Sequence, residues 1–421
     1  MHIYDRSMPA DQVDAAQREE IRKAVGDLLH DHYVFPDIVP AIVDRLESSE
    51  RAGRYRTDSR SVLAELIGAD MREAAADKHL GLRVDPDANA ALRKSHDRDN
   101  GLQESAARAA ARIHYGLVEQ RILEGNVRYL RITDFDWVPD ATAASYDAAA
   151  RFLSGADAIL IDVRGNRGGE PPAVQYLVSH FLEPDKLLMT FREGSTAAVQ
   201  SRALAHLPAG RLSGIPLSVL IDGNTYSAGE AFAYHVRHFG LGELVGADTA
   251  GAANLNELLP VGSDFVVSIS HGRPVHPVTG TNWEGVGVPP TIAAAPAQAL
   301  DVAHAAALQR MIAAATTDEL RAEYEWALVA VDARRQPPSP DPAAVAAYAG
   351  SYDPAEVAVR AGELWLSRPS RRDFRLVPLT TDGLYGADGN DGMRVRFTPD
   401  RMELLFRGSP QRQLYRRAAS R

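Results

Sequence analysis

Ser227 is the residue of this sequence best placed for nucleophilic chemistry. It stands in the segment 225–230, between an apolar strand predicted over 217–221 and a helix predicted over 228–239. In an open α/β sheet such a corner faces the ligand crevice, where the first helix amides and the positive end of the helix dipole stabilise an oxyanion. Taken alone, the residues favour a plainer role, because Ser227 and Glu230 also form a capping-box sequence.

A second corner is rich in glycine. The apolar strand 158–163 runs into the segment 165–170, which contains Gly168 and Gly169, before a helix start at Pro171. Glycines permit positive φ and let backbone amides approach a ligand closely, as an oxyanion hole requires. The segment matches neither the dinucleotide-binding nor the phosphate-loop pattern. A tight strand-to-helix turn explains the same residues equally well.

A serine nucleophile needs a base, and a histidine base needs a partner that holds its orientation. His79, in the segment 77–80, is a candidate base, and Glu284, in the segment 281–292, is a candidate acidic partner. The sequence has 13 histidines, most of which must serve the surface or the core. Spacing alone therefore does not assign these roles.

Two aromatic residues could line a hydrophobic substrate pocket near these groups. Trp283 precedes Glu284 and Phe232 follows Ser227, although core packing is the commoner role for such side chains. No metal site and no cofactor are predicted: His235 and His238 lack a third ligand, and the segment 388–392 lacks the spacing of a calcium loop and is predicted as a turn.

The elements that must position these residues follow a helical, then mixed, then all-β order. Helical periodicity covers residues 11–75, strands alternate with helices from 116 onward, and short strands separated by turns follow a proline-rich linker at 335–342. The span 85–111 is polar and alanine-rich, gives no clear prediction and resembles a connecting excursion. The predicted class is α/β, with a helical domain at 1–77, a catalytic α/β core at 78–296, a helical connector and linker at 297–340 and a small antiparallel β domain at 341–421.

Composition narrows the partners. The 421 residues are 45% hydrophobic and 24% charged, as in a globular protein with a large core. The net charge of −10 and the lack of a basic run disfavour nucleic acid and anionic membranes as partners. There is no cysteine, so disulfides and thiolate sites are excluded. Neither a signal peptide nor a membrane span is visible, which favours a cytoplasmic location and leaves export behind a trimmed signal open.

Taken together, the motifs resemble the tail-specific, or C-terminal-processing, serine peptidase superfamily (peptidase family S41), in its branch similar to interphotoreceptor retinoid-binding protein. The likeness runs from about residue 15 to 295 and rests on five segments in the family's order: 115–119, 123–130, 162–170, 225–230 and 284–290. It implies a core like the crotonase and Clp protease spiral of β and α layers.

The resemblance also implies roles for particular residues. Ser227 aligns with the nucleophile, His79 with the histidine of an Asp-x-His motif and Glu284 with the acidic residue. The oxyanion donors would be the backbone amides of Ala228 and of Gly168 or Gly169.

Three departures from the family pattern matter. Relatives with a serine–lysine dyad carry the lysine where the segment 249–254 has alanine, so this dyad is unavailable. The span 85–114 is too short for the PDZ domain that those relatives insert. Lys78 stands where tetrad-bearing relatives have a serine, which leaves the coupling of Glu284 to His79 open.

Three functions remain open at this point, with the first preferred. The leading hypothesis is a serine hydrolase, most simply a peptidase, that acts on a peptide or small-molecule substrate. The second is a non-catalytic carrier of an apolar small molecule, and the third is a crotonase-like lyase or cyclase that uses the same oxyanion hole. Retention of serine, histidine and acid together favours the hydrolase. The substrate and the oligomeric state stay open.

Overall fold

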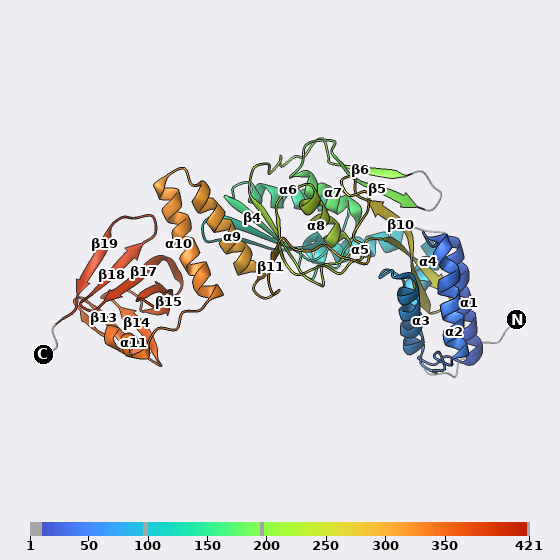
Figure 1. Cartoon of the computed structure of the whole chain (residues 1–421), viewed down its shortest axis with the longest axis horizontal. Helices are drawn as coiled ribbons and strands as arrows, with labels where there is room; N and C mark the ends of the chain where they lie inside the picture. Colours follow the sequence, from blue (N-terminus) through green and yellow to red (C-terminus); the bar gives the residue numbers. More distant parts are fainter. Residues whose placement is uncertain (1–10, 96–99, 194–197, 419–421) are drawn as a thin grey trace. The chain divides into compact units, whose positions relative to one another are not determined.

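The computed structural model describes residues 11–95, 100–193 and 198–418 (Figure 1). The chain divides into two compact units. The first comprises Met1–Gln120, Leu130–Gly155 and Ile161–Ala293, and the second comprises Arg121–Tyr129, Ala156–Leu160 and Ala294–Arg421. The division separates the chain by compactness and does not test the domain boundaries expected from the sequence. The four domains therefore stay a prediction.

The N-terminal region is helical, as predicted. Three helices, α1 (Ala15–His32), α2 (Val39–Arg51) and α3 (Arg60–Ala75), are joined by turns that include the 3-10 helix η1 (Pro36–Ile38). Asp14 begins α1 by accepting the Gln17 amide at 2.8 Å, which satisfies one of the unpaired donors at the helix start. The apolar stripes of the helices form one core with strands β9 and β10, introduced below.

One sheet of the first unit is antiparallel and is built around a long strand. Its strand order is β1-β10-β5-β6, and β9 also pairs with β10. The strands are β1 (Gly81–Val84), β5 (Leu187–Glu193), β6 (Val199–Arg202), β9 (Leu255–Val261) and β10 (Phe265–Val275). Gly81 pairs with Ser268, so the segment that precedes β1, which contains His79, lies beside β10.

The second sheet has the order β11-β8-β7-β4-β3-β2. Its strands are β2 (Leu117–Leu123), β3 (Val127–Ile132), β4 (Ala158–Asp162), β7 (Leu217–Ile221), β8 (Glu243–Gly246) and β11 (Ile292–Ala293). β4 and β7 are buried at every position, as expected for apolar runs covered on both faces. Helix α7 (Pro171–Ser179) packs against α6 (Ala141–Leu153) and α8 (Ala228–His238). These strands and helices confirm the mixed α/β class.

The span 85–111, which has no clear pattern in the sequence and resembles a connecting excursion, contains helices. The chain forms helix α4 (Pro86–Ser95) and helix α5 (Asn100–Arg112), followed by the 3-10 helix η2 (His114–Gly116). The alanine content that obscured the periodicity is itself helix-favouring. Asp85 begins α4 by accepting the Ala88 amide at 3.0 Å, and Asn89 holds the helix to β10 through a 2.6 Å hydrogen bond to the Phe265 carbonyl oxygen.

The described residues of the C-terminal part form helices and an antiparallel sheet. The helices are α9 (Ala299–Ala314), α10 (Asp318–Arg335) and α11 (Pro342–Tyr348). The eight strands β12 to β19 pair in sequence order, which confirms the predicted all-β tail. They are Gly350–Tyr352, Ala355–Arg360, Glu363–Ser367, Phe374–Pro378, Leu384–Ala387, Asn390–Thr398, Arg401–Phe406 and Arg412–Arg416. Across the described residues, no helix combines the length and hydropathy needed to cross a bilayer.

Gly116 fixes a close backbone crossing that positions the glycine-rich corner. Its φ is +85°, and a Cβ built on it would lie 1.9 Å from the Asp134 carbonyl oxygen. Phe135, the next residue, donates its amide to Gly168 at 2.8 Å and accepts the Glu170 amide at 2.8 Å. Any side chain at position 116 would therefore collide with the backbone of Asp134 and displace Phe135, to which the glycine-rich corner is hydrogen bonded.

We predict that Gly116→Ala lowers the free energy of unfolding much more than Gly210→Ala does. Gly210 has a similar φ of +76°, but a Cβ there would meet nothing within 4 Å. The control should therefore cost only the left-handed strain of about 1 to 2 kcal/mol. Gly116→Ala should cost about 2 kcal/mol more, because backbone must move. Urea unfolding of both variants measures this, and equal losses would contradict the proposed crossing.

Candidate active site

Ser227 lies at a strained corner between β7 and α8. Its φ of 50° and ψ of −113° are outside the regions that residues other than glycine ordinarily adopt. Such strain persists where the surroundings over-determine the backbone, and it is typical of functional positions. The side chain is half-buried, and the Ser227 amide donates to Glu230 Oε2 at 3.0 Å. The Glu230 side chain therefore makes one of the two hydrogen bonds of the predicted capping box, the one to the amide of the residue that precedes the helix.

The serine corner and the glycine-rich corner are hydrogen bonded to each other. They follow β7 and β4, which are neighbours in the sheet. The Tyr226 amide donates to the Asn166 carbonyl oxygen at 2.9 Å, and the Gly165 amide donates to Asp222 Oδ1 at 3.0 Å. These bonds hold the two loops side by side, so the position of one fixes the position of the other.

Two backbone amides beside Ser227 are without an acceptor. The amides of Gly169 and Ala228 donate to no group in the described part of the chain, whereas the Gly168 amide donates to Asn166 Oδ1 at 2.9 Å. Of the two glycines proposed as oxyanion donors, Gly169 is therefore the one with an amide available. A Cβ built on Gly168 would lie 3.4 Å from Ser227 Oγ, so the two corners are in close contact at this point.

His79 meets Ser227 across 148 residues of sequence. Its Nε2 lies 3.3 Å from Ser227 Oγ, slightly beyond the range of about 2.6 to 3.2 Å expected of a working general base, as is common without substrate. Burial lowers the pKa of His79, and the charge of Asp77 opposes part of this shift. The imidazole is therefore held neutral, which is the form that can accept a proton.

The segment that carries His79 is fixed from several sides. Its amide donates to Asp77 Oδ1 at 2.9 Å, and its carbonyl oxygen accepts from Ser268 Oγ at 2.6 Å. Tyr226 Oη donates to the Lys78 carbonyl oxygen at 3.1 Å, and Lys78 Nζ donates to the Ala250 carbonyl oxygen. The lysine that departs from the family pattern thus binds a backbone carbonyl.

Glu284 lies close to the imidazole together with Asp77. One side-chain atom from each of Asp77, His79 and Glu284 lies within 4.8 Å of the others. Burial raises the pKa of Glu284, and the charge of Asp77 adds to this rise. In the described chain, His79 Nδ1 and Glu284 Oε1 are both sealed from solvent without a hydrogen-bond partner. The cluster therefore contains a ring nitrogen that can donate a hydrogen bond and a carboxylate oxygen that can accept one, and neither has a partner among the described residues.

A cation at this cluster would compete with existing hydrogen bonds. Asp77 Oδ2 accepts from Tyr33 Oη at 3.2 Å and from Asn254 Nδ2 at 3.0 Å. Glu284 Oε2 accepts the amides of Ala253 at 2.5 Å and Asn254 at 3.0 Å. Both carboxyl groups already hold N–H and O–H donors, so the cluster is arranged to orient an imidazole rather than to hold a metal ion.

A small cavity of about 50 Å³ opens beside Ser227. Trp283 lines it, with Nε1 bonded to the Ala252 carbonyl oxygen at 3.0 Å, as does His235, whose pKa burial lowers to about 3. Phe232, the other pocket candidate, is instead a fully buried core residue that packs against Phe135. The lining contains no Lys, Arg, Asp or Glu: it consists of Gly169, Pro171, Val174, Gln175, Leu188, Met189, Phe191, Ser201, Ser227, Ala228, Ala231, His235, Ala253, Leu255, Pro274 and Trp283.

Sequence reasoning missed several residues that build this site. Glu230 was expected only to cap a helix, yet its buried carboxylate also accepts from Thr249 Oγ1 at 2.5 Å and from the Gly251 amide at 2.6 Å. Asn166 and Asn254 had no role assigned. Asp77 was known only as the first residue of the Asp-x-His motif, and its spacing from His79 is the signal for its role, because an Asp side chain readily accepts an amide two residues on.

Comparisons with known proteins give one curated relative and several distant structures. The carboxy-terminal processing protease CtpB of Bacillus subtilis (strain 168) is 27% identical over 180 residues, which cover 42% of this chain and 35% of the relative. The aligned region thus spans about a third of that protein's length.

Solved structures match this chain at low identity and with TM-scores below 0.5. A lipoprotein from Streptococcus agalactiae is 13% identical with a TM-score of 0.47, and the match covers 74% of this chain and all of that one. The photosystem II D1 C-terminal processing protease is 14% identical with a TM-score of 0.43, covering 68% and 94% respectively. At these scores the likeness carries no inference about activity.

Two family models match consecutive parts of the sequence. Residues 15–115 match the N-terminal domain of family S41 peptidases found in eukaryotic IRBP. Residues 126–294, which contain both corners and Glu284, match peptidase family S41 itself. The two matches stand in the order expected of a single protein, and the chain belongs to peptidase family S41.

Proposed function

We propose that this protein is a serine peptidase with Ser227 as nucleophile and His79 as general base. The observation that carries the proposal is the 3.3 Å approach of Ser227 Oγ to a neutral His79 beside two unoccupied backbone amides. A nucleophile, its base and an oxyanion site are the three parts that acyl transfer requires. Family membership supports the same assignment.

In the proposed reaction, Ser227 Oγ attacks the scissile carbonyl carbon while its proton passes to His79 Nε2. The carbonyl oxygen becomes an oxyanion and accepts from the amides of Gly169 and Ala228. His79 then donates the proton to the leaving amine as the C–N bond breaks, which leaves an acyl group on Ser227. Water attacks this ester by the same route in reverse and restores the free serine.

Glu284 and Asp77 are proposed to hold the imidazole and to stabilise its cation. Nε2 can accept a proton only when the ring hydrogen is on Nδ1. His79 Nδ1 lacks an acceptor and Glu284 Oε1 lacks a donor in the described chain, so a small shift would join them. Asp77 supplies the charge that favours the imidazolium.

The substrates that fit best are peptides with a small uncharged side chain next to the scissile bond. The cavity beside Ser227 holds about 50 Å³, and its lining has no charged carboxylate or ammonium. A charged side chain would enter without a partner, at a large desolvation cost. The same small volume weighs against the apolar-carrier alternative, because sites for small-molecule ligands ordinarily span about 300 to 1,000 Å³.

Ser227→Ala should lower turnover of a peptide substrate by on the order of 10³-fold or more, because the attacking oxygen is lost. A fluorophosphonate probe should add to Ser227 in the wild type and not in the variant, as measured by intact mass. Ser201 lines the same cavity and provides the matched control, so Ser201→Ala should still be labelled. Labelling that survives Ser227→Ala would refute the assignment.

The pH dependence of kcat/KM should follow the protonation of His79. Because burial lowers its pKa, kcat/KM should stay level through neutral pH and decline only below the ordinary histidine value of about 6.5. Asp77→Asn removes a charge that favours the imidazolium, so the acid limb should move to still lower pH while the rate falls. Asp37→Asn removes an exposed carboxylate elsewhere and should leave the limb in place. An unmoved limb in Asp77→Asn would contradict the proposed coupling.

Peptides that differ only in the side chain next to the scissile bond should show whether the cavity beside Ser227 receives that side chain. Those with Ala or Val next to the scissile bond should be cleaved about 100-fold better than those with Lys or Asp, because a charge there would be desolvated without a partner. Ala231→Leu narrows the cavity and should lower kcat/KM for Val more than for Gly at this position. Equal cleavage of Lys and Ala peptides would show that this cavity does not receive the side chain.

A further inference from the structure

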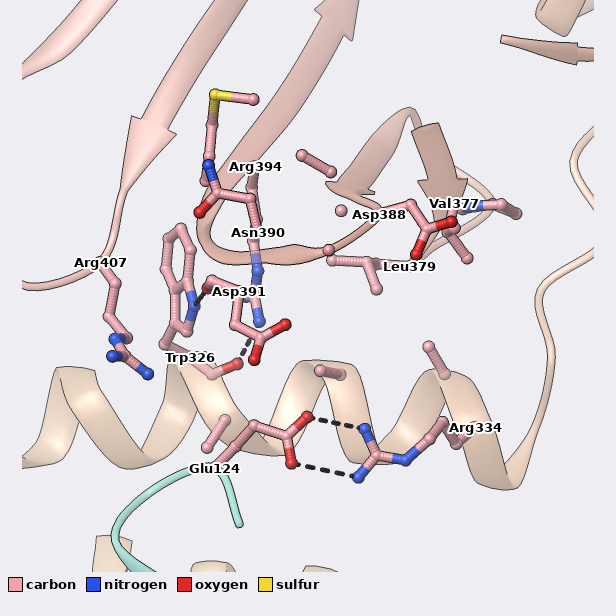
Figure 2. A pocket seen from close by; sticks show the side chains of 18 of the residues that line it. Glu124, Trp326, Arg334, Val377, Leu379, Asp388, Asn390, Asp391, Arg394 and Arg407 are labelled. Carbon is pink, nitrogen blue, oxygen red and sulfur yellow. Dashed lines mark hydrogen bonds and ion pairs between the residues drawn. The ribbon is translucent and has the colours of Figure 1, made fainter. Parts of the chain in front are cut away.

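A second, larger cavity lies within the C-terminal unit (Figure 2). Its volume is about 360 Å³, at the small end of the range for small-molecule sites. One wall is helix α10, and the other is formed by the strands β15, β16 and β17 with the turn at 388–389 that joins the last two. The mechanism proposed above uses none of these residues.

Arg394, from β17, is a buried cation in this lining. Only 6% of the residue is exposed, and its guanidinium carbon lies 3.9 Å from the centroid of the Trp326 ring. One Nη donates to the Trp326 carbonyl oxygen. Its other donors have no acceptor among residues 11–95, 100–193 and 198–418, and no carboxylate there lies within ion-pair distance. An arginine has five N–H donors, so most of the N–H groups of Arg394 are available to bind a ligand.

Four of the other five charged side chains in the lining have ionic partners, and the fifth, Asp391, has none among the described residues. Figure 2 shows the ion pair of Glu124 with Arg334. The shortest N–O distance of that pair is 2.8 Å, and Asp388 pairs with Arg375 at 2.9 Å. Arg407 lies 3.7 Å from Glu323. Burial lowers the pKa of Arg394 to about 10, partly opposed by Glu124, so the guanidinium stays charged at neutral pH.

The rest of the lining is largely apolar. Ala327, Ala330 and Ala333 stand on one face of α10, three residues apart, and Val377 and Leu379 lie on the opposite wall. The indole of Trp326 is fixed by a 3.0 Å hydrogen bond from Nε1 to the Asp391 carbonyl oxygen, which keeps the ring under the guanidinium. A ligand here would therefore meet an apolar slot with one cationic end.

We propose that this cavity binds a monocarboxylate with a small apolar body, its carboxylate on Arg394 and its body between α10 and the strands. The planar guanidinium matches a carboxylate through two parallel hydrogen bonds. The carboxylates of Glu124 and Asp391 lie around the same space and would repel a dianion such as phosphate more strongly. The carboxylate could belong to a free aliphatic acid or to the last residue of a peptide.

Calorimetric titration of the full chain tests this proposal with matched acid and amide pairs. Hexanoate and hexanamide represent the free acid, and N-acetyl-leucine and N-acetyl-leucinamide represent a chain terminus. At least one acid should bind about tenfold or more tightly than its amide, and which acid binds better identifies the source. Equal binding of acid and amide, binding of neither acid, or tighter binding of inorganic phosphate would overturn the proposal.

Variants locate the binding. Arg394→Gln should weaken the bound acid at least about tenfold, because the charged hydrogen bonds are lost. Should that variant unfold, as circular dichroism would show, Ala330→Leu decides, since it fills the cavity and leaves Arg394 in place. Ala322→Leu lies on the same helix outside the lining and should bind like the wild type. Unchanged binding in Ala330→Leu would place the ligand elsewhere.

Discussion

The hydrogen bonds around Asn166 are the constraint on which the rest of the site depends. This residue is fully buried, and its side chain accepts the Gly168 amide and donates to the Ile132 carbonyl oxygen at 3.0 Å. Its own carbonyl oxygen accepts the Tyr226 amide. One residue thus binds the Gly168 amide, anchors the glycine corner to β3 and holds the serine corner beside it. Gly169 and Ala228, whose amides have no acceptor in the described chain, line the same cavity as Ser227.

A second level of support comes from two buried carboxyl groups. The Glu230 carboxylate accepts hydrogen bonds from the Ser227 amide and from the segment 249–252. The Glu284 carboxylate accepts the next two amides, those of Ala253 and Asn254. The segment 249–254 is where dyad-bearing relatives place a lysine. Here its small side chains let the backbone amides reach both carboxylates, so the segment links the serine corner to the histidine cluster. Burying each carboxylate is costly, and these donors offset the cost.

The sequence predicted some of this arrangement for clear physical reasons. The apolar runs of β4 and β7 and the periodic helices are local signals, and they were identified correctly. The meeting of His79 with Ser227 is a tertiary fact across 148 residues, which only the family resemblance anticipated. Asn166 acts through hydrogen bonds to the distant backbone of Ile132 and Tyr226, and Asn254 donates to the distant carboxylates of Asp77 and Glu284. Such partners leave no pattern in one sequence. The helices over 86–95 and 100–112 were missed because alanine hid their amphipathic stripe. Phe232 takes the core position that was the commoner of the two roles open to it.

The structure of a peptide boronate adduct tests the central claim most directly, because its tetrahedral boron mimics the acyl-transfer intermediate. The account predicts a bond from boron to Ser227 Oγ, with one boronate oxygen accepting from the amides of Gly169 and Ala228 at about 2.7 to 3.1 Å. It also predicts that His79 Nε2 lies within hydrogen-bond distance of the adduct. A boronate bound to another residue, or one whose oxygens point to solvent while both amides remain without an acceptor, would contradict the account.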